Sequence, residues 1–158
     1  MFRDLTRKNN LLSFNECVEI LIFEKRGVLS VIGDNDYPYG MPMNHYYNSD
    51  DECIYFHCGK AGHRIDSLKR CNKASFCVFD LGRKSTSDWA LDIRSVVVFG
   101  RIDIIIDREI VSEITRKLSL KFTNNEKYID DEIKAHIKNT VLLKLTPEHI
   151  CGKLVHEA

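Results

Sequence analysis

The stretch that decides the fold is residues 54–72, IYFHCGKAGHRIDSLKRCN. It begins with apolar and aromatic residues, which predict a short strand over 53–58. Gly59 and Gly62 then mark a turn, and the pattern beyond them predicts a helix over 61–71. The sequence therefore predicts a strand, a turn and a helix in immediate succession.

Basic residues gather at the start of this expected helix, at Lys60, His63 and Arg64. The free N–H groups and the positive dipole end of a helix start favour an anion and disfavour basic side chains. A bound phosphate would remove that unfavourable interaction by pairing with the basic residues. The alternative is an ordinary strand-to-helix connection with solvated Lys and Arg side chains, and the local pattern leaves both open.

On either side of this stretch, short strand patterns alternate with a few helices. Short turns between strands favour antiparallel pairing over parallel crossovers. Six strands at this spacing predict a small antiparallel β-barrel with flanking helices, which is a mainly β or α+β fold. The expected strands are 28–32, 37–47, 53–58, 74–80, 89–106 and 141–145.

Local signals place the helices and the irregular positions. Ser13 and Glu16 have the capping-box spacing that opens a helix, and Asp107 is expected to cap a second one. Gly100 suggests a bulge or bend inside its strand, because glycine tolerates the dihedrals that a bulge requires. Pro147 is expected to end the last strand, with the tail continuing extended along the sheet. A further short helix is expected over 128–137, and a polar loop over 81–88. The expected apolar positions of the first two helices are Phe14, Cys17, Val18, Leu21 and Ile22, then Ile110, Ile114, Leu118 and Phe122.

Composition limits the class of protein. A length of 158 residues suits one domain, taken here as 1–158, with a real hydrophobic core. Lys+Arg and Asp+Glu are equal at 23 each, so no net field attracts nucleic acid or an anionic membrane. No apolar run is long enough to span a bilayer, and the start MFRDLTRKNN lacks a signal-peptide core. We therefore expect a cytoplasmic protein that binds neither nucleic acid nor membrane.

Six cysteines occur without any CxxC pair, which favours reduced, small apolar side chains over disulfides. A zinc site from His57, Cys58 and His63 is conceivable but lacks ligand spacing, so no metal is expected. The sequence also lacks GxGxxG, Walker, GxSxG and HExxH motifs, the signatures of dinucleotide folds, nucleotide hydrolysis, serine hydrolysis and zinc proteolysis.

Two further segments could contact a ligand. Pro42 lies within a strand pattern, where it belongs at an edge or an opening because it cannot donate a ladder hydrogen bond. Neighbouring backbone groups could then bind a planar, polar-edged ligand, although an edge proline that discourages aggregation explains the pattern as well. Arg94 and Ser95 form a polar pair that leads into a buried strand, and Arg94 could instead pair with a carboxylate elsewhere.

Together these segments resemble the pyridoxamine 5′-phosphate oxidase-like flavin-binding split-barrel superfamily, and within it the Nim-type nitroimidazole-resistance proteins. The resemblance spans about residues 5–155. It rests on four segments in family order: GVLSVIGDNDYPYGMPMNHYY (27–47), IYFHCGKAGHRIDSLKRCNKASFCVFD (54–80), DWALDIRSVVVFGRI (88–102) and ICGK (150–153).

This resemblance implies a six-stranded split barrel that forms a homodimer, with FMN in clefts at the subunit interface. His63 and Arg64 match the basic pair for the flavin phosphate, and His57 is the candidate proton donor or substrate contact, with a structural role equally open. The motif's serine is Gly62 here and its lysine is Arg64. The implied cofactor-binding residues are Met41, Pro42, Met43, Asn44, Phe56, His57, Cys58, His63, Arg64, Arg94 and Ser95.

The resemblance suggests an FMN-dependent oxidoreductase that acts on a small molecule, such as a nitroimidazole or another nitroaromatic compound. The flavin would carry the chemistry, and the protein would bind and orient it. The chain stops at GKLVHEA, without the longer C-terminal segment of a true pyridoxamine phosphate oxidase, which argues against vitamin B6 synthesis. The alternatives are a non-catalytic flavin, haem or deazaflavin binding protein, and a dimeric interaction domain that has lost its cofactor.

Overall fold

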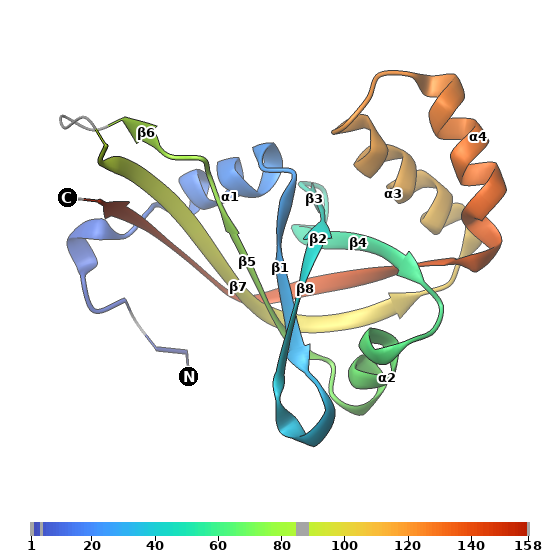
Figure 1. Ribbon diagram of the computed structural model, residues 1–158, viewed down its shortest axis with the longest axis horizontal. Coiled ribbons are helices and arrows are strands. Elements are labelled where there is room, and N and C mark those ends of the chain that lie inside the picture. The colour runs from blue at the N-terminus through green and yellow to red at the C-terminus, as the bar shows by residue number, and fades with distance from the viewer. Residues whose placement is uncertain (1, 4, 85–88, 158) are drawn as a thin grey trace.

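An antiparallel sheet that curves strongly on itself forms the centre of the computed structural model, which describes residues 2–3, 5–84 and 89–157 (Figure 1). Seven strands follow one another in the order β2-β1-β5-β7-β8-β4-β3, and the short β6 pairs with β7. The strands are β1 (Arg26–Ile32), β2 (Pro38–Asn44), β3 (Tyr46–Asn48), β4 (Cys53–Gly59), β5 (Lys73–Phe79), β6 (Arg83–Lys84), β7 (Leu91–Ile105) and β8 (Thr140–His156).

Four α-helices flank the sheet in the described part of the chain: α1 (Phe14–Phe23), α2 (His63–Arg70), α3 (Arg108–Leu120) and α4 (Glu126–His136). Short 3-10 turns occupy Lys8–Asn10, Asp34–Asp36 and Ile137–Asn139. α3 and α4 form a pair beside the β3–β4 hairpin, and α2 follows the far end of β4 (Figure 1). None of these helices combines the length and the apolar character needed to cross a membrane.

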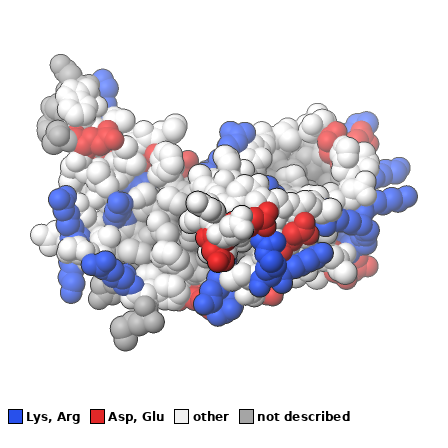
Figure 2. Space-filling model, turned by 60° about the horizontal axis from the view of Figure 1, so that its bottom comes forward, with Lys and Arg blue, Asp and Glu red and all other residues white. Residues whose placement is uncertain are grey.

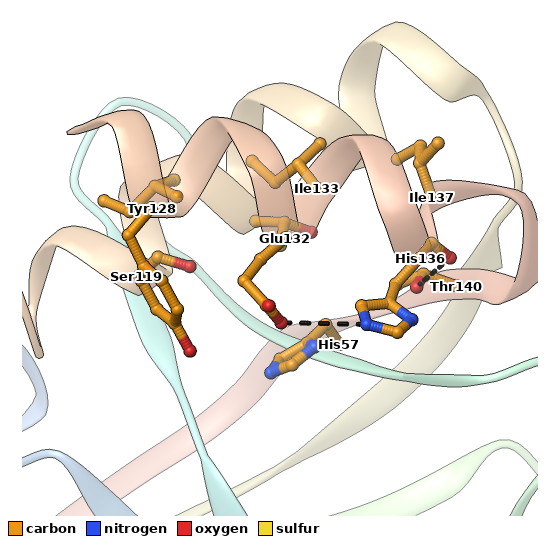
Figure 3. A pocket seen from close by; sticks show the side chains of 10 residues that line it. His57, Ser119, Tyr128, Glu132, Ile133, His136, Ile137 and Thr140 are labelled. Atoms are coloured by element: carbon orange, nitrogen blue, oxygen red, sulfur yellow. Dashed lines mark hydrogen bonds and ion pairs between the residues drawn. The ribbon is translucent and has the colours of Figure 1, made fainter. Parts of the chain in front are cut away.

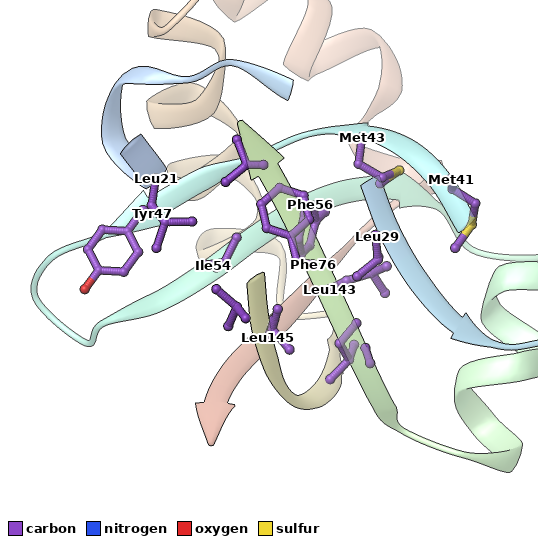
Figure 4. Close-up of a cluster of buried hydrophobic side chains, with 14 of the residues drawn as sticks. Leu21, Leu29, Met41, Met43, Tyr47, Ile54, Phe56, Phe76, Leu143 and Leu145 are labelled. Carbon is purple, nitrogen blue, oxygen red and sulfur yellow. The ribbon is translucent and has the colours of Figure 1, made fainter. Parts of the chain in front are cut away.

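The core lies inside the curve of the sheet (Figure 4). Phe56 and Phe76 meet edge to face there, with ring centroids 5.0 Å apart, and both are fully buried. A smaller cluster lies on the other face of β4, where Cys53 and Tyr55 pack under Val111 of α3. β4 is therefore buried on both faces over most of its length, and only its last residues reach the surface.

The expected antiparallel α+β barrel architecture is confirmed, but the number of strands is wrong. The predicted strand 37–47 changes partner at His45, so that β2 pairs with β1 while β3 pairs with β4. His45 turns inward at this break, where its Nε2 lies 2.8 Å from the carbonyl oxygen of Leu21. β6 adds a short strand inside the loop expected at 81–88, of which residues 85–88 lie outside the described part.

Pro147 does not end the last strand, because β8 runs through it to His156. The β7–β8 register shifts between Phe99 and Gly100, since Phe99 pairs with His149 and Gly100 with Pro147. The extra residue in β8 makes a bulge, a position where proline is tolerated. The bulge predicted at Gly100 is thus confirmed.

Lack of space for a side chain, rather than the dihedral angles of the bulge, explains the glycine at position 100. A Cβ there would lie 2.1 Å from the carbonyl oxygen of Thr146, so close backbone approach requires the glycine.

Both predicted helix caps are present, but some of the predicted apolar helix positions are exposed. The Ser13–Glu16 capping box is present, and the Asp107 side chain accepts hydrogen bonds from the backbone N–H groups of Glu109 and Ile110. In α1, Ile20 is buried, whereas the predicted Phe14 and Ile22 are exposed. In α3, Val111 is buried in addition to the predicted positions, whereas Ile110 is 45% exposed. The predicted Cys17 and Leu21 of α1 and the predicted Ile114 and Leu118 of α3 are buried, so most of each predicted stripe is confirmed.

Candidate functional site

The strand-turn-helix predicted at residues 54–72 is present, as β4 followed by α2. Gly62 precedes the helix with φ of 113°, a conformation that L side chains rarely adopt, so glycine is required at this position. No side chain of the described residues caps α2 at Gly62. The N–H groups of the first helical turn are therefore available to an anion from outside.

A hollow of about 290 Å³ lies at this corner, between the start of α2, the end of β4 and Tyr39 of β2. A Cβ added at Gly59 or Gly62 would meet nothing within 4 Å, so open space borders the backbone at both glycines. The lining residues are Tyr39, Cys58, Gly59, Ala61, Gly62, His63, Arg64 and Ile65. A ligand group could therefore approach the main chain closely here.

Arg64 is a basic residue of the corner that lines the hollow and has no carboxylate partner among the described residues. It is half-buried, and its Nε lies 2.9 Å from the sulfur of Met41, a weak acceptor. Among the described residues it forms no ion pair with a carboxylate, unlike Arg70, which binds Asp34 at 2.8 Å. Burial raises the pKa of the neighbouring Cys58 thiol, and Arg64 opposes that shift. The guanidinium group is thus free to bind an anion in the hollow.

His63 is already engaged by protein groups. Its ring stacks on Tyr39 with centroids 4.3 Å apart, and its Nε2 lies 3.4 Å from Oδ2 of Asp34. Asp34 therefore competes with any phosphate for a protonated His63. Of the predicted basic pair, Arg64 is the more available residue and His63 forms the side wall.

The segment 41–44 lies on β2, at one end of the strand order, so the edge position predicted for Pro42 is confirmed. Met41 and Met43 point into the core and are nearly buried, whereas Pro42 is exposed. The side chain of Asn44 accepts a hydrogen bond of 3.0 Å from Nε of Arg26. Any ligand contact from this segment would therefore come from the main chain or from the outward face at Pro42.

The three predicted residues at the end of β4 point in different directions. Phe56 is fully buried in the core, so its side chain cannot reach a ligand. Cys58 lines the corner hollow, whereas His57 faces the opposite side of the strand, below α4. The structure thus brings Cys58 to the corner with Arg64 and separates His57 from both.

Arg94 and Ser95 are not part of the corner hollow. Nε of Arg94 lies 2.8 Å from Asp80, and its Nη1 lies 3.0 Å from Glu19. Burial alone would raise the pKa of Asp80, but its hydrogen bonds with Arg94 outweigh burial and lower it. The interpretation of Arg94 as a partner of carboxylates is confirmed, and Ser95 lies on the outer face of the sheet beside Val97.

A second hollow, of about 190 Å³, lies between α3, α4 and the end of β4, and His57 forms part of its lining (Figure 3). The residue stays exposed as a whole, but neighbouring atoms exclude enough water to lower its pKa below the ordinary histidine value. Thr140, which lines this hollow, pairs in the sheet with Gly59, which lines the corner. The two hollows therefore lie near the same end of β4, on opposite sides of the strand. Sequence reasoning missed this second hollow, although Tyr128, Glu132 and His136 recur at the four-residue spacing of one helix face.

Within residues 2–3, 5–84 and 89–157, no group of three or more His, Cys, Asp or Glu side chains is placed to hold a metal ion. Acidic and basic side chains share the face shown in Figure 2, with uncharged surface between them. The anion-binding features of the corner are therefore local.

Comparison with known proteins identifies the family. A family model described as pyridoxamine 5′-phosphate oxidase matches residues 13–154. The chain belongs to the pyridoxamine 5′-phosphate oxidase family. A search of the curated proteins gives no match.

Solved structures of low sequence identity share the split-barrel fold. A provisionally assigned 5-nitroimidazole antibiotic resistance protein from Bacteroides thetaiotaomicron has a TM-score of 0.79 at 17% identity, over 93% of this chain and 87% of that chain. An FAD-binding protein from Mesorhizobium loti has a TM-score of 0.65 at 21% identity, over 92% and 96%. An FAD and heme binding protein from Mycobacterium smegmatis has a TM-score of 0.70 at 16% identity, over 90% and 71%. The resemblance that the sequence suggested is thereby confirmed at the level of family and fold.

Proposed function

We propose that the chain is a flavin-binding oxidoreductase domain over residues 1–158 and that FMN is its cofactor. The observation that carries the proposal is Arg64, a half-buried guanidinium that has no carboxylate partner among the described residues, next to the uncapped start of α2. A phosphate in the corner would accept hydrogen bonds from this guanidinium and from the first-turn N–H groups together. The residues present at the corner therefore fit a flavin phosphate.

The relatives support a flavin as the ligand class, because two of the similar solved structures are described as FAD-binding. The size of the corner favours a terminal phosphate, since the hollow has a volume of only about 290 Å³. β2 is an edge strand, so the main chain around Pro42 could hydrogen-bond the polar edge of a flavin ring. We therefore place the phosphate at Arg64 and the ring along the exposed side of β2 and β4.

The bound flavin would supply electron transfer to a small-molecule substrate, of which nitroimidazoles and other nitroaromatic compounds are the proposed examples. The protein would orient the cofactor through Arg64 and exclude water from part of it through Tyr39 and the backbone of β4. The six cysteines are all free thiols in the structure, which suits the reducing cytoplasm.

We further propose that two copies form a homodimer with the flavin at the interface. The strand register aligns Pro42, Val28, Cys77, Val97 and Cys151 in one row across five neighbouring strands. Phe79 lies on the same face and is 57% exposed. A row of apolar side chains across a sheet is the kind of surface that a second copy covers.

Absorbance spectroscopy of the purified protein with FMN tests the function. We expect saturable binding of FMN, and then reduction of a nitroimidazole when the bound flavin is supplied with electrons. Binding without turnover would support the non-catalytic alternative. Failure to bind any flavin would contradict the proposal, and a haem spectrum in its place would favour a ligand of the kind described for the Mycobacterium smegmatis protein.

A further inference from the structure

The tip of the β1–β2 hairpin lies beside α2 (Figure 1). Asp34, at this tip, contacts two side chains of the helix: its Oδ2 lies 3.4 Å from Nε2 of His63, and its Oδ1 lies 2.8 Å from Nη2 of Arg70. His63 and Arg70 are about two helical turns apart, so they project from the same face of α2. The hairpin therefore brings a carboxylate to the helix face that begins at the corner hollow.

The two contacts of Asp34 differ in length. The distance to Arg70 is that of a charge-assisted hydrogen bond. The distance to His63 exceeds the range of about 2.7–3.2 Å in which N–H groups ordinarily donate to oxygen. Arg70 therefore holds the carboxylate at the helix, and the contact with His63 is the one that another anion can replace more easily.

His63 connects this carboxylate with the corner hollow, which it lines next to Arg64. Tyr39 stacks on the ring, and a Cβ at Gly33 would lie only 3.5 Å from Nε2 of His63, so the hairpin packs closely against the ring. A phosphate that binds His63 in the hollow therefore lies within about one Debye length of the Asp34 carboxylate, which is about 10 Å at 0.1 M salt. Like charges at this separation repel each other.

Two other acidic residues near the corner lack such a contact. Asp36 ends the same turn as Asp34, and Asp66 lies in the first turn of α2; both are exposed. Neither forms an ion pair with a basic residue in the described part of the chain. Asp34 is therefore the carboxylate that is placed to compete for a basic residue of the corner.

We propose that Asp34 sets the affinity of the corner for its cofactor, because its carboxylate competes with the flavin phosphate for His63 and so weakens FMN binding. This role rests on the proposed function. Arg70 keeps the carboxylate in place while the phosphate replaces it at His63. Because coupling between two interactions is reciprocal, the bound phosphate also weakens the contact between Asp34 and His63. The opposing charge makes FMN an exchangeable cofactor rather than a permanently held one.

The variant Asp34→Asn keeps the shape of the side chain and removes its charge. Flavin-free protein is titrated with FMN and with riboflavin, which lacks the phosphate. We expect Asp34→Asn to bind FMN about 2- to 5-fold more tightly than the parent does, the effect of one exposed ion pair, and to bind riboflavin equally well. At about 1 M salt most of this gain should disappear, because the Debye length falls to about 3 Å. A purely structural role of Asp34 predicts no such dependence on the phosphate or on salt.

The matched control is Asp36→Asn, which removes the same charge from the same turn. Asp36 has a φ of 60°, a conformation that asparagine tolerates well. This variant should change FMN affinity clearly less than Asp34→Asn does. In a His63→Gln background, Asp34→Asn should lose most of its gain, because the carboxylate acts through His63. Circular dichroism checks that each variant is folded.

NMR of the His63 ring separates this inference from the proposed function. A parent protein that binds neither FMN nor riboflavin contradicts the proposed function, and inorganic phosphate then serves as the probe of the corner. We expect phosphate to shift the His63 signals at a lower concentration in Asp34→Asn than in the parent. No difference between the two proteins, with FMN or with inorganic phosphate, would overturn the role of Asp34. Weaker FMN binding or tighter riboflavin binding by Asp34→Asn would overturn it as well.

Discussion

Basic side chains in this molecule differ in what neutralises them. Arg94 is held by Asp80 and Glu19, whereas Arg64 bonds the sulfur of Met41 and has no carboxylate partner in the described part of the chain. The sequence could place Arg64 at a helix start, because glycines and basic residues mark that turn locally. It could not show which arginine keeps a free guanidinium, since the carboxylate partners of Arg94 come from distant segments. The case for Arg64 as the phosphate ligand therefore depends on the folded structure.

His45 is a buried histidine that no predicted site required. Its Nε2 lies 2.8 Å from the carbonyl oxygen of Leu21, and its Nδ1 has no partner among the residues described. Burial, helped by the nearby Lys121, lowers the pKa of His45 to about 3. The folded protein therefore holds this ring neutral, whereas the unfolded chain protonates it near the ordinary value of about 6.5.

This difference predicts a pH-dependent stability. The folded pKa lies below the unfolded one, so the contribution of His45 is full above about pH 6.5 and is lost as the pH falls toward 3. Between pH 7.5 and 5.5 the loss is about 1.4 kcal/mol in the free energy of unfolding. Urea unfolding at both pH values measures it, and His45→Gln should remove that part of the pH dependence. Equal losses in the parent and the variant would contradict this assignment.

At the scale of elements, local patterns identified strands and helices better than they identified partners. The alternation over 37–47 is a strand pattern throughout, but only the fold shows that its two parts pair with different neighbours at His45. The prediction that Pro147 ends the last strand was wrong for the same reason, because β8 accommodates this proline at the bulge opposite Gly100. Partner choice is a long-range property, so the sequence near these residues could not reveal it.

The bulge predicts a contrast between two glycines in strands. In Gly100→Ala the new methyl group would clash with the carbonyl oxygen of Thr146, 2.1 Å away, and the backbone must shift. We expect a loss of about 1–3 kcal/mol in the free energy of unfolding, as in other overpacked sites. Gly59→Ala, where nothing lies within 4 Å, should change stability by less than about 0.5 kcal/mol. Thermal or urea unfolding compares them, and similar losses in both would show that close approach does not explain Gly100.

At the scale of the whole molecule, the order of the four segments predicted the family and the split-barrel architecture. The corner was predictable because its strand, turn and helix are consecutive in the sequence. The hollow below α4 was not, because it joins His57 to residues more than 50 positions later in the chain, such as Thr115 and Tyr128. The site built from consecutive residues could therefore be predicted, whereas the hollow that joins distant segments could not.

The apolar row across the outer sheet face predicts the oligomeric state. Phe79→Asp places a charge on that face and should convert a dimer into a monomer in sedimentation experiments. Ile106→Asp is the matched control, because Ile106 is 72% exposed and follows the far end of β7. A parent protein that is monomeric, or a Phe79→Asp variant that remains dimeric, would contradict the proposed interface.

The central claim, a flavin phosphate bound by Arg64, is tested most directly by comparing FMN with riboflavin, which lacks the phosphate. Titrations use the parent, Arg64→Ala and the control Lys69→Ala, a residue in the last turn of α2. Charge-assisted hydrogen bonds predict that the parent prefers FMN by about 10- to 100-fold, and that Arg64→Ala loses most of this preference. Lys69→Ala should keep it. An unchanged preference for FMN in Arg64→Ala, or no preference in the parent, would contradict the account.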